Sequence, residues 1–203
     1  MPPPRLLVFL KAARLGAVKT RLAATVGAVA ALAAYRELVA ATLQNLTLAA
    51  AELHVELRFS PDDAAREIAP WRRVGWGAVA QGAGDLGERL ARGFGDALGD
   101  GCQRVLVIGS DCPTVNAADL RAALVALEDH DVVLGPATDG GYWLLGLRAP
   151  QPELFTGIDW STPQVLAQTL QRAAAAGLRV ARLRELSDVD TEVEWRKWAN
   201  RRR

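Results

Sequence analysis

Short apolar runs alternate with longer helical patterns along the whole chain. Residues 5–10 form a largely apolar run of the kind found in buried parallel strands, and residues 104–108 form the clearest one. Apolar positions in residues 53–59 alternate with His54, Glu56 and Arg58, which predicts a half-buried strand with these three side chains in solvent. Further strands are predicted at residues 76–80, 131–135, 142–147 and 178–183.

Helical patterns fill the intervals between these strands. The predicted helices cover residues 20–51 with a bend near Gly27, a short stretch opened by residues 60–63, residues 84–98, residues 116–127, a stretch from residues 161–163 to Gly177, and a last helix capped by residues 191–194. The alternation predicts a single α/β domain over residues 1–203. Its sheet should be mostly parallel and twisted, with helices on both faces.

Composition narrows the classes of partner and compartment. The chain has 203 residues and a formal charge of +1, from 24 basic and 23 acidic residues, so we expect neither a nucleic-acid nor a membrane partner. Cys102 and Cys112 lack the further ligands of a structural zinc site and favour a reducing compartment. The apolar stretch after Met1 is too short for a signal peptide, which predicts a cytoplasmic protein. A homodimer is left open.

Polar clusters follow the predicted strands where each strand ends. The clusters are Lys11 with Lys19 and Arg21, residues 81–87, residues 109–113, residues 137–141, and residues 187–190. Ligands of parallel α/β sheets bind outside the carboxyl ends of the strands, so these clusters should meet in one site.

The charges in these clusters suit a polyphosphate and a divalent cation. Lys and Arg neutralise phosphate oxygens, and aspartates such as Asp111 hold Mg²⁺ or Mn²⁺. Lys19 and Arg21 would lie on the first turn of a helix, where the backbone dipole disfavours cations by ~0.3–1 kcal/mol each. Replacing either should therefore leave stability unchanged or slightly improved.

Structural roles are the alternatives for the same residues. Lys19 and Arg21 could be solvated helix residues, Asp111 a turn residue before Pro113, and Asp190 a helix cap. No P-loop motif is present, and neither a serine nucleophile elbow nor a cysteine–histidine pair is visible. Residues 82–87 match G-x-G-x-x-G literally, but the strand before them is weak, so a dinucleotide site is poorly supported.

Six stretches in this order resemble one known family. They are KAARLGAVKTRL, QGAGDLGERL, VIGSDCPTV, DVVLGPATDGGYWLLGL, WSTPQVLAQT and ELSDVDT, and together they span residues 5–194. The chain is identified by them as a member of the DUF2064 family, whose members are often named glycosyltransferases with radical-SAM, selenodomain or arsenosugar-biosynthesis gene neighbours. The resemblance implies the GT-A-type fold of nucleotide-diphospho-sugar transferases, which molybdenum-cofactor and phospholactate nucleotidyltransferases share.

The resemblance also implies roles for individual residues. The implied nucleotide site holds Lys11, Lys19, Arg21, Gln81, Gly82 and Asp85; the implied metal site holds Asp111, Asp188 and Asp190; and the implied acceptor side holds Asp139, Gly140, Gly141 and Tyr142. Lys19, Arg21 and Asp111 would carry catalysis. The chain departs from the family pattern at Ala13 and Leu15, where prolines are usual, and the stretch from Gly109 to Asp111 has one aspartate in place of D-x-D.

These observations lead to one expected function and two alternatives. The leading expectation is a Mg²⁺- or Mn²⁺-dependent glycosyltransferase that takes a nucleotide-diphospho-sugar donor and a small-molecule acceptor. The first alternative is a nucleotidyltransferase that joins an NTP to a small phosphorylated or hydroxylated acceptor and releases pyrophosphate. The second is a non-catalytic nucleotide-binding accessory protein.

Overall fold

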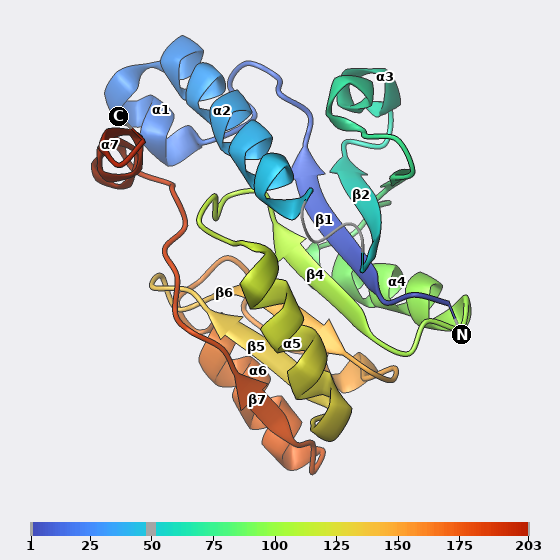
Figure 1. The fold of residues 1–203 in the computed structure, drawn as a ribbon. Helices are drawn as coiled ribbons and strands as arrows, with labels where there is room; N and C mark the ends of the chain where they lie inside the picture. The colour runs from blue at the N-terminus through green and yellow to red at the C-terminus, as the bar shows by residue number, and fades with distance from the viewer. Residues whose placement is uncertain (1, 48–51, 203) are drawn as a thin grey trace.

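The computed structural model describes residues 2–47 and 52–202 (Figure 1). The strands are β1 (Arg5–Lys11), β2 (His54–Ser60), β3 (Gly77–Ala80), β4 (Val105–Gly109), β5 (Val132–Pro136), β6 (Tyr142–Leu147) and β7 (Val180–Arg182). The α-helices are α1 (Thr20–Val26), α2 (Ala28–Leu46), α3 (Ala65–Ile68), α4 (Leu86–Gly99), α5 (Ala117–Asp129), α6 (Val165–Ala175) and α7 (Glu192–Asn200). Short 3-10 turns cover Ala69–Trp71 and Pro152–Phe155.

All the strands belong to one seven-stranded sheet in the order β3-β2-β1-β4-β6-β5-β7. β1 pairs in parallel with β2 and β4, and β6 alone runs antiparallel, between β4 and β5. Because β6 is antiparallel to both β4 and β5, β5 points the same way as β4, and so does β7, which pairs in parallel with β5. The mostly parallel α/β fold is confirmed, and the carboxyl ends of six strands share one edge.

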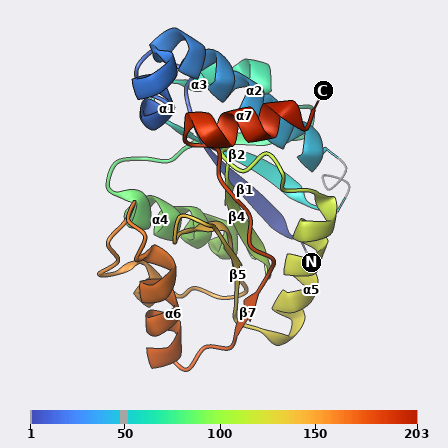
Figure 2. The ribbon, with the colours of Figure 1, turned by 90° about the vertical axis from the view of Figure 1, so that its left-hand side faces the viewer.

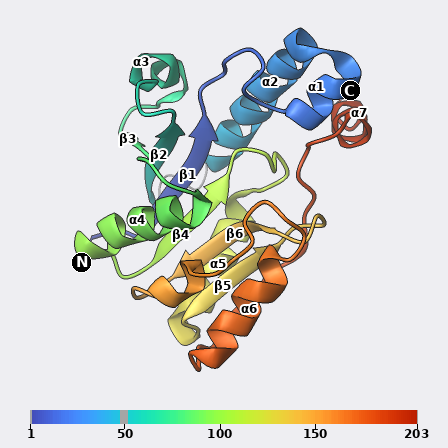
Figure 3. The same cartoon turned by 180° about the vertical axis from the view of Figure 1, so that it is seen from behind.

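Two core clusters cover the two faces of this sheet. Alternate β1 residues divide between them, with Leu6 and Val8 facing α2 and α5 and with Leu7 and Phe9 facing α4. Figure 1 shows α2 and α5 on one face, and Figure 3, from behind, shows α4 and α6 on the other. The two-faced helical cover is therefore as the sequence predicts.

The predicted solvent face of β2 is wrong for two of its three polar residues. His54 is exposed, but Glu56 and Arg58 are buried. Arg58 contacts Glu56 and donates from Nη1 to Asp96 Oδ2 on α4 at 2.7 Å. Helix α4 covers this face of the sheet, so the two charges are buried as paired ions, which period-two alternation cannot reveal.

Several predicted helix boundaries also shift. The bend near Gly27 is a complete break, because Gly27 ends α1 and begins α2. The predicted end of this helical stretch, at residues 48–51, lies outside the described residues. Helix α3 begins at Ala65 rather than within residues 60–63, and α6 begins at Val165 rather than at Pro163.

The amino- and carboxyl-terminal helical segments meet at the carboxyl edge of the sheet. Figure 2 shows α7 beside α1 and α2, beyond the ends of the central strands. Trp195 of α7 packs against the cluster of Leu22, Ala31 and Ala34, and Trp198 packs with Leu38 and Val189. None of the helices within residues 2–47 and 52–202 combines the length and apolarity needed to cross a bilayer.

Candidate active site

A cavity of about 600 Å³ opens at the carboxyl edge of the sheet. Most of its charged and polar lining comes from the ends of β1, β3 and β4 and from the starts of α1, α4 and α7, with additions from α2 and from the segment before α6. The residues that carry these groups are Lys11, Lys19, Thr20, Arg21, Tyr35, Gln81, Asp85, Arg89, Ser110, Asp111, Ser161 and Asp190. Seven of the predicted site residues therefore lie on one cavity: Lys11, Lys19, Arg21, Gln81, Asp85, Asp111 and Asp190.

Lys19 lies at the centre of the charged part of this cavity. Its Nζ is 2.9 Å from Asp111 Oδ1 and 2.7 Å from Asp190 Oδ1, while its side chain is only 3% exposed. Burial alone would lower the pKa of Lys19, but Asp111 and Asp190 outweigh the burial and raise the pKa, so the ammonium is charged. The alternative of Lys19 as a solvated helix residue is wrong, because its ammonium is buried between two carboxylates. We therefore expect removal of Lys19 to lower stability, since two carboxylates would lose their counter-ion.

The backbone at Lys19 is strained as well. Lys19 is the residue before α1 and has φ 49° and ψ 48°, a left-handed conformation that non-glycine residues adopt at a cost of ~1–3 kcal/mol. Its carbonyl accepts a hydrogen bond from Ala23 N at 2.8 Å, which starts the helix. The conformation and the two ion pairs together fix the position of the ammonium.

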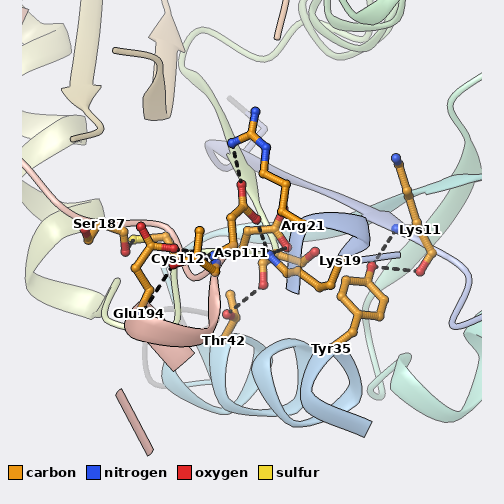
Figure 4. Close-up of polar contacts among 12 residues, drawn as sticks. Lys11, Lys19, Arg21, Tyr35, Thr42, Asp111, Cys112, Ser187 and Glu194 are labelled. Carbon is orange, nitrogen blue, oxygen red and sulfur yellow. Dashed lines mark hydrogen bonds and ion pairs between the residues drawn. The ribbon is translucent and has the colours of Figure 1, made fainter. Parts of the chain in front are cut away.

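Asp111 is held by the loop that follows β4. Thr42 and Asn45 of α2 donate to the carbonyls of Ser110 (3.4 Å) and Pro113 (2.8 Å), and Asp111 O accepts from Val189 N at 3.0 Å. Figure 4 shows Asp111 and Lys19 directed toward one another, with Arg21 above them. Asp111 Oδ1 is buried, yet no donor among the described residues makes an aligned hydrogen bond to it, although Lys19 Nζ lies within ion-pair distance.

The alternative role of Asp190 as a helix cap is wrong. Thr191 is the residue that caps α7, and Glu194 accepts from the backbone N–H groups of Asp190 and Thr191, both at 2.8 Å. The Asp190 carboxylate is thus left for Lys19 and, at 3.9 Å, for Arg21. Arg21 itself is 66% exposed and lines the cavity.

Asp188 lies among other carboxylates. Burial, together with Asp111, Asp139 and Asp190, raises the pKa of Asp188 to about 7, against a smaller opposite effect of Lys19. Among the described residues, no group of three or more His, Cys, Asp or Glu side chains is arranged to hold a metal. Asp111 and Asp190, which share the Lys19 ammonium, are the two predicted metal ligands that converge; the metal role of Asp188 stays a prediction.

The predicted acceptor side is formed by a tight turn. Asp139 Oδ1 accepts from Gly141 N at 2.9 Å, and Gly140 has φ 88°. A Cβ at Gly140 would collide with the carbonyl oxygen of Pro163, so glycine is required there for packing. Tyr142 packs in the core cluster under α4 and α6, and burial raises its pKa. Roles for these residues in acceptor binding stay predictions.

The glycine-containing loop after β3 is held by two arginines of α4. Arg92 donates to the carbonyls of Gln81 and Ala83, whereas Arg89 donates from Nε to Gly84 O at 2.9 Å and lines the cavity. Gln81 Nε2 donates to Leu10 O (3.3 Å) and Arg58 O (2.8 Å), and its Oε1 accepts a long hydrogen bond from Arg89 Nη1 at 3.5 Å.

Asp85 has a structural role that the sequence did not assign. It caps α4 in a reciprocal capping box with Glu88. Gly82 N donates to Asp62 Oδ1 at 3.1 Å. The nucleotide roles of Gln81, Gly82 and Asp85 stay predictions.

Arg89 and Tyr35 line the cavity but are not among the predicted site residues. Arg89 stands four residues after Asp85, and that spacing on a predicted helix places both on one face, so the signal was present. Tyr35 left no such signal: it is buried on α2, and its hydroxyl accepts from Lys11 N and donates to Lys11 O, which fixes the end of β1.

Neither cysteine offers a nucleophile. Cys102 and Cys112 are free and buried, and burial raises the pKa of Cys112 to about 12. Cys112 Sγ lies 3.7 Å from Ser187 O, so this thiol joins the loop after β4 to the segment that carries Asp188 and Asp190.

Comparison with known proteins gives both a family and a fold. The model of the family described as "Uncharacterized protein conserved in bacteria (DUF2064)" matches residues 42–162. A 3-phospho-D-glycerate guanylyltransferase of Phenylobacterium zucineum (strain HLK1) is 40% identical over 82 residues, which are 38% of this chain and 34% of that protein. The match thus spans about a third of the length of this curated relative.

Two solved structures extend the comparison over nearly the whole chain. A protein of Desulfovibrio desulfuricans G20, assigned as a nucleotide-diphospho-sugar transferase, is 35% identical with a TM-score of 0.87 over 94% of this chain and 84% of its own. A manganese complex of Rv0371C from Mycobacterium tuberculosis H37Rv is 17% identical with a TM-score of 0.56, over 97% of each chain, and shares the fold alone.

Proposed function

The chain belongs to the DUF2064 family, and we propose that it is a divalent-metal-dependent nucleotidyltransferase. It would join an NTP to a small phosphorylated or hydroxylated acceptor and release pyrophosphate. The observation that carries this proposal is the convergence of Asp111 and Asp190 on one cation position, in a cavity that also carries Lys11, Arg21 and Arg89.

Two observations favour nucleotidyl transfer over the leading expectation of glycosyl transfer. A single aspartate, Asp111, follows β4, and Gly109 stands where a D-x-D motif would place its first carboxylate. The curated relative is a guanylyltransferase. Glycosyl transfer is the second candidate, and the assignment of the Desulfovibrio desulfuricans protein supports it.

The residues at the cation position fit a hard divalent ion. Mg²⁺ is usually bound by one or two carboxylates, with substrate phosphates and water completing the octahedron. Asp111 and Asp190 supply two carboxylates that converge on one cation, the Lys19 ammonium, at 2.9 and 2.7 Å. The buried Asp111 Oδ1 makes no aligned hydrogen bond within the described residues beyond that ion pair, so it would be open to a metal at the same position. When bound, Mg²⁺ or Mn²⁺ would neutralise phosphate charge.

The remaining groups of the cavity would position the nucleotide and the acceptor. Lys11, Arg21 and Arg89 would neutralise the phosphate chain, and the Gln81 loop would face the base and ribose. In the transfer step an acceptor oxygen forms a bond to the α-phosphorus while the bond from that phosphorus to the α–β bridging oxygen breaks. Pyrophosphate leaves with that electron pair, and a hydroxyl acceptor gives up its proton to water. Catalysis by this chain would consist of positioning and charge neutralisation.

The single continuous sheet, which lies between the two core clusters, supports one domain over residues 1–203.

A substrate screen tests the proposal. Pools of NTPs and of nucleotide-diphospho-sugars are incubated with phosphorylated and hydroxylated acceptors and Mg²⁺ or Mn²⁺, and pyrophosphate release and sugar consumption are measured. We expect acceptor-dependent pyrophosphate release from an NTP, lost in Asp111→Asn. Consumption of a nucleotide-sugar without pyrophosphate release would establish glycosyl transfer instead. Nucleotide binding without turnover in any pool would favour the accessory role.

A further inference from the structure

The ammonium of Lys19 takes the position between Asp111 and Asp190 that a divalent metal would need. Both carboxylate contacts are shorter than 3 Å, and the Lys19 side chain is almost fully buried between them. Figure 4 shows the Lys19 side chain reaching Asp111 beneath Arg21. Because a metal–oxygen bond to Mg²⁺ is ~2.1 Å, the ion and the ammonium cannot share this position.

We infer that Lys19 is the resident counter-ion of the metal position and that metal enters only as Lys19 leaves. This inference rests on the proposed function, since it assumes that Asp111 and Asp190 are the metal ligands. In the protein without nucleotide, Lys19 pairs with the two carboxylates. Once the metal has replaced it there, Lys19 pairs with a phosphate of the nucleotide. Metal and nucleotide would consequently bind together, each raising the affinity of the other.

Two features of the chain make such an exchange reasonable. The lysine stem has four flexible carbons, so its ammonium can move several ångströms without backbone rearrangement. Lys19 is also in a left-handed conformation at the junction of the β1–α1 loop and α1, which is a strained position held by its surroundings. The exposed Arg21, 3.9 Å from Asp190, lines the same cavity and would help to hold an anionic ligand near the displaced ammonium.

Manganese binding without nucleotide tests the exchange directly. Mn²⁺ is titrated into the wild type and Lys19→Met, and free Mn²⁺ is measured by electron paramagnetic resonance. Removing a cation from contact with the metal position should tighten Mn²⁺ binding about tenfold or more, because a monovalent and a divalent charge a few ångströms apart repel even in a water-like dielectric. Lys19→Arg keeps the charge and should show no gain.

Matched controls separate a local exchange from a general change of charge. Lys11→Met removes a lysine from the same cavity but away from the two carboxylates, so its Mn²⁺ affinity should stay within about threefold of wild type. The gain in Lys19→Met should disappear when Asp111→Asn is added. Equal Mn²⁺ affinity of wild type and Lys19→Met, an equal gain in Lys11→Met, or a gain that survives Asp111→Asn would overturn the inference.

A second variant covers the case in which Lys19→Met does not fold. Lys19→Gln retains a hydrogen-bond donor to Asp190 and serves as the second variant; if both variants unfold, Mn²⁺-induced refolding followed by circular dichroism replaces the titration. Absence of such refolding would overturn the inference. Because no NTP is present, a failed substrate screen would reject the proposed reaction and leave the Mn²⁺ result standing, and the reverse also holds.

Discussion

Replacing Lys19 by methionine should destabilise the protein when divalent metals are absent. Methionine keeps much of the volume of lysine but leaves the carboxylates of Asp111 and Asp190 facing one another without a cation between them. Breaking a fully buried ion pair typically costs ~3–5 kcal/mol. The side chains of Asp111 and Asp190 are 44% and 34% exposed, so water takes up part of the lost interaction. We therefore expect a loss of about 2 kcal/mol in the free energy of unfolding.

The assay is urea unfolding in EDTA, followed by circular dichroism and tryptophan fluorescence. A loss of this size in a chain of 203 residues should also lower the melting temperature by roughly 4–8 °C. A double-mutant cycle with Asp190→Asn isolates the pairwise interaction, because the loss should be smaller when the Asp190 charge is already absent. If Lys19→Met equals or exceeds the wild type in stability, the helix-dipole penalty outweighs the ion pairs and our reading of this site is refuted.

Three further comparisons test other parts of the site. Arg89→Gln should weaken NTP binding about tenfold and cost less stability than Arg92→Gln, because Arg89 makes one close contact with a loop carbonyl and Arg92 makes two. Equal losses of NTP affinity in the two variants would contradict the assignment of Arg89 to the phosphate site. Thr191→Ala should lower the free energy of unfolding in urea by about 1 kcal/mol, because it removes a helix cap. Asp190→Asn should abolish the effect of the metal on nucleotide affinity. If that effect is retained in Asp190→Asn, then Asp190 is not a metal ligand. The pKa of Asp188 is raised to about 7, so its stabilising contribution is full below its unfolded pKa and is lost as pH rises through 7. In EDTA, Asp188→Asn should therefore gain stability over wild type at pH 8 but not at pH 4, and an equal gain at both values would contradict this.

The sheet and the location of the site follow from local patterns in the chain. Apolar runs such as residues 5–10 and 104–108 specify buried strands through their own periodicity, and the helices between them force parallel connections. Parallel strands bring their carboxyl ends to one edge whatever their order in the sheet. Lys19, Asp111 and Asp190 could thus be placed in one cavity before their contacts were known.

The pairing of charges depends on distances that no local pattern contains. Lys19 and Asp190 are 171 positions apart, and their contact requires α7 to dock beside α1 through Trp195. From its place in the sequence, Lys19 is expected to be a cation at a helix end, where solvent and the helix dipole govern its energy. In the folded chain it is a buried counter-ion between two carboxylates, so we expect the same lysine to stabilise the fold.

The face of β2 gives the same lesson for burial. Glu56 and Arg58 have the alternating spacing of a strand face that meets solvent. Helix α4 nevertheless covers them, and Asp96 of α4 neutralises Arg58. Alternation along a strand reports which residues share a face, but only the packing of a helix decides whether that face meets water. A charged face can be buried when the covering element brings the opposite charge, because the paired ions then offset each other's loss of hydration.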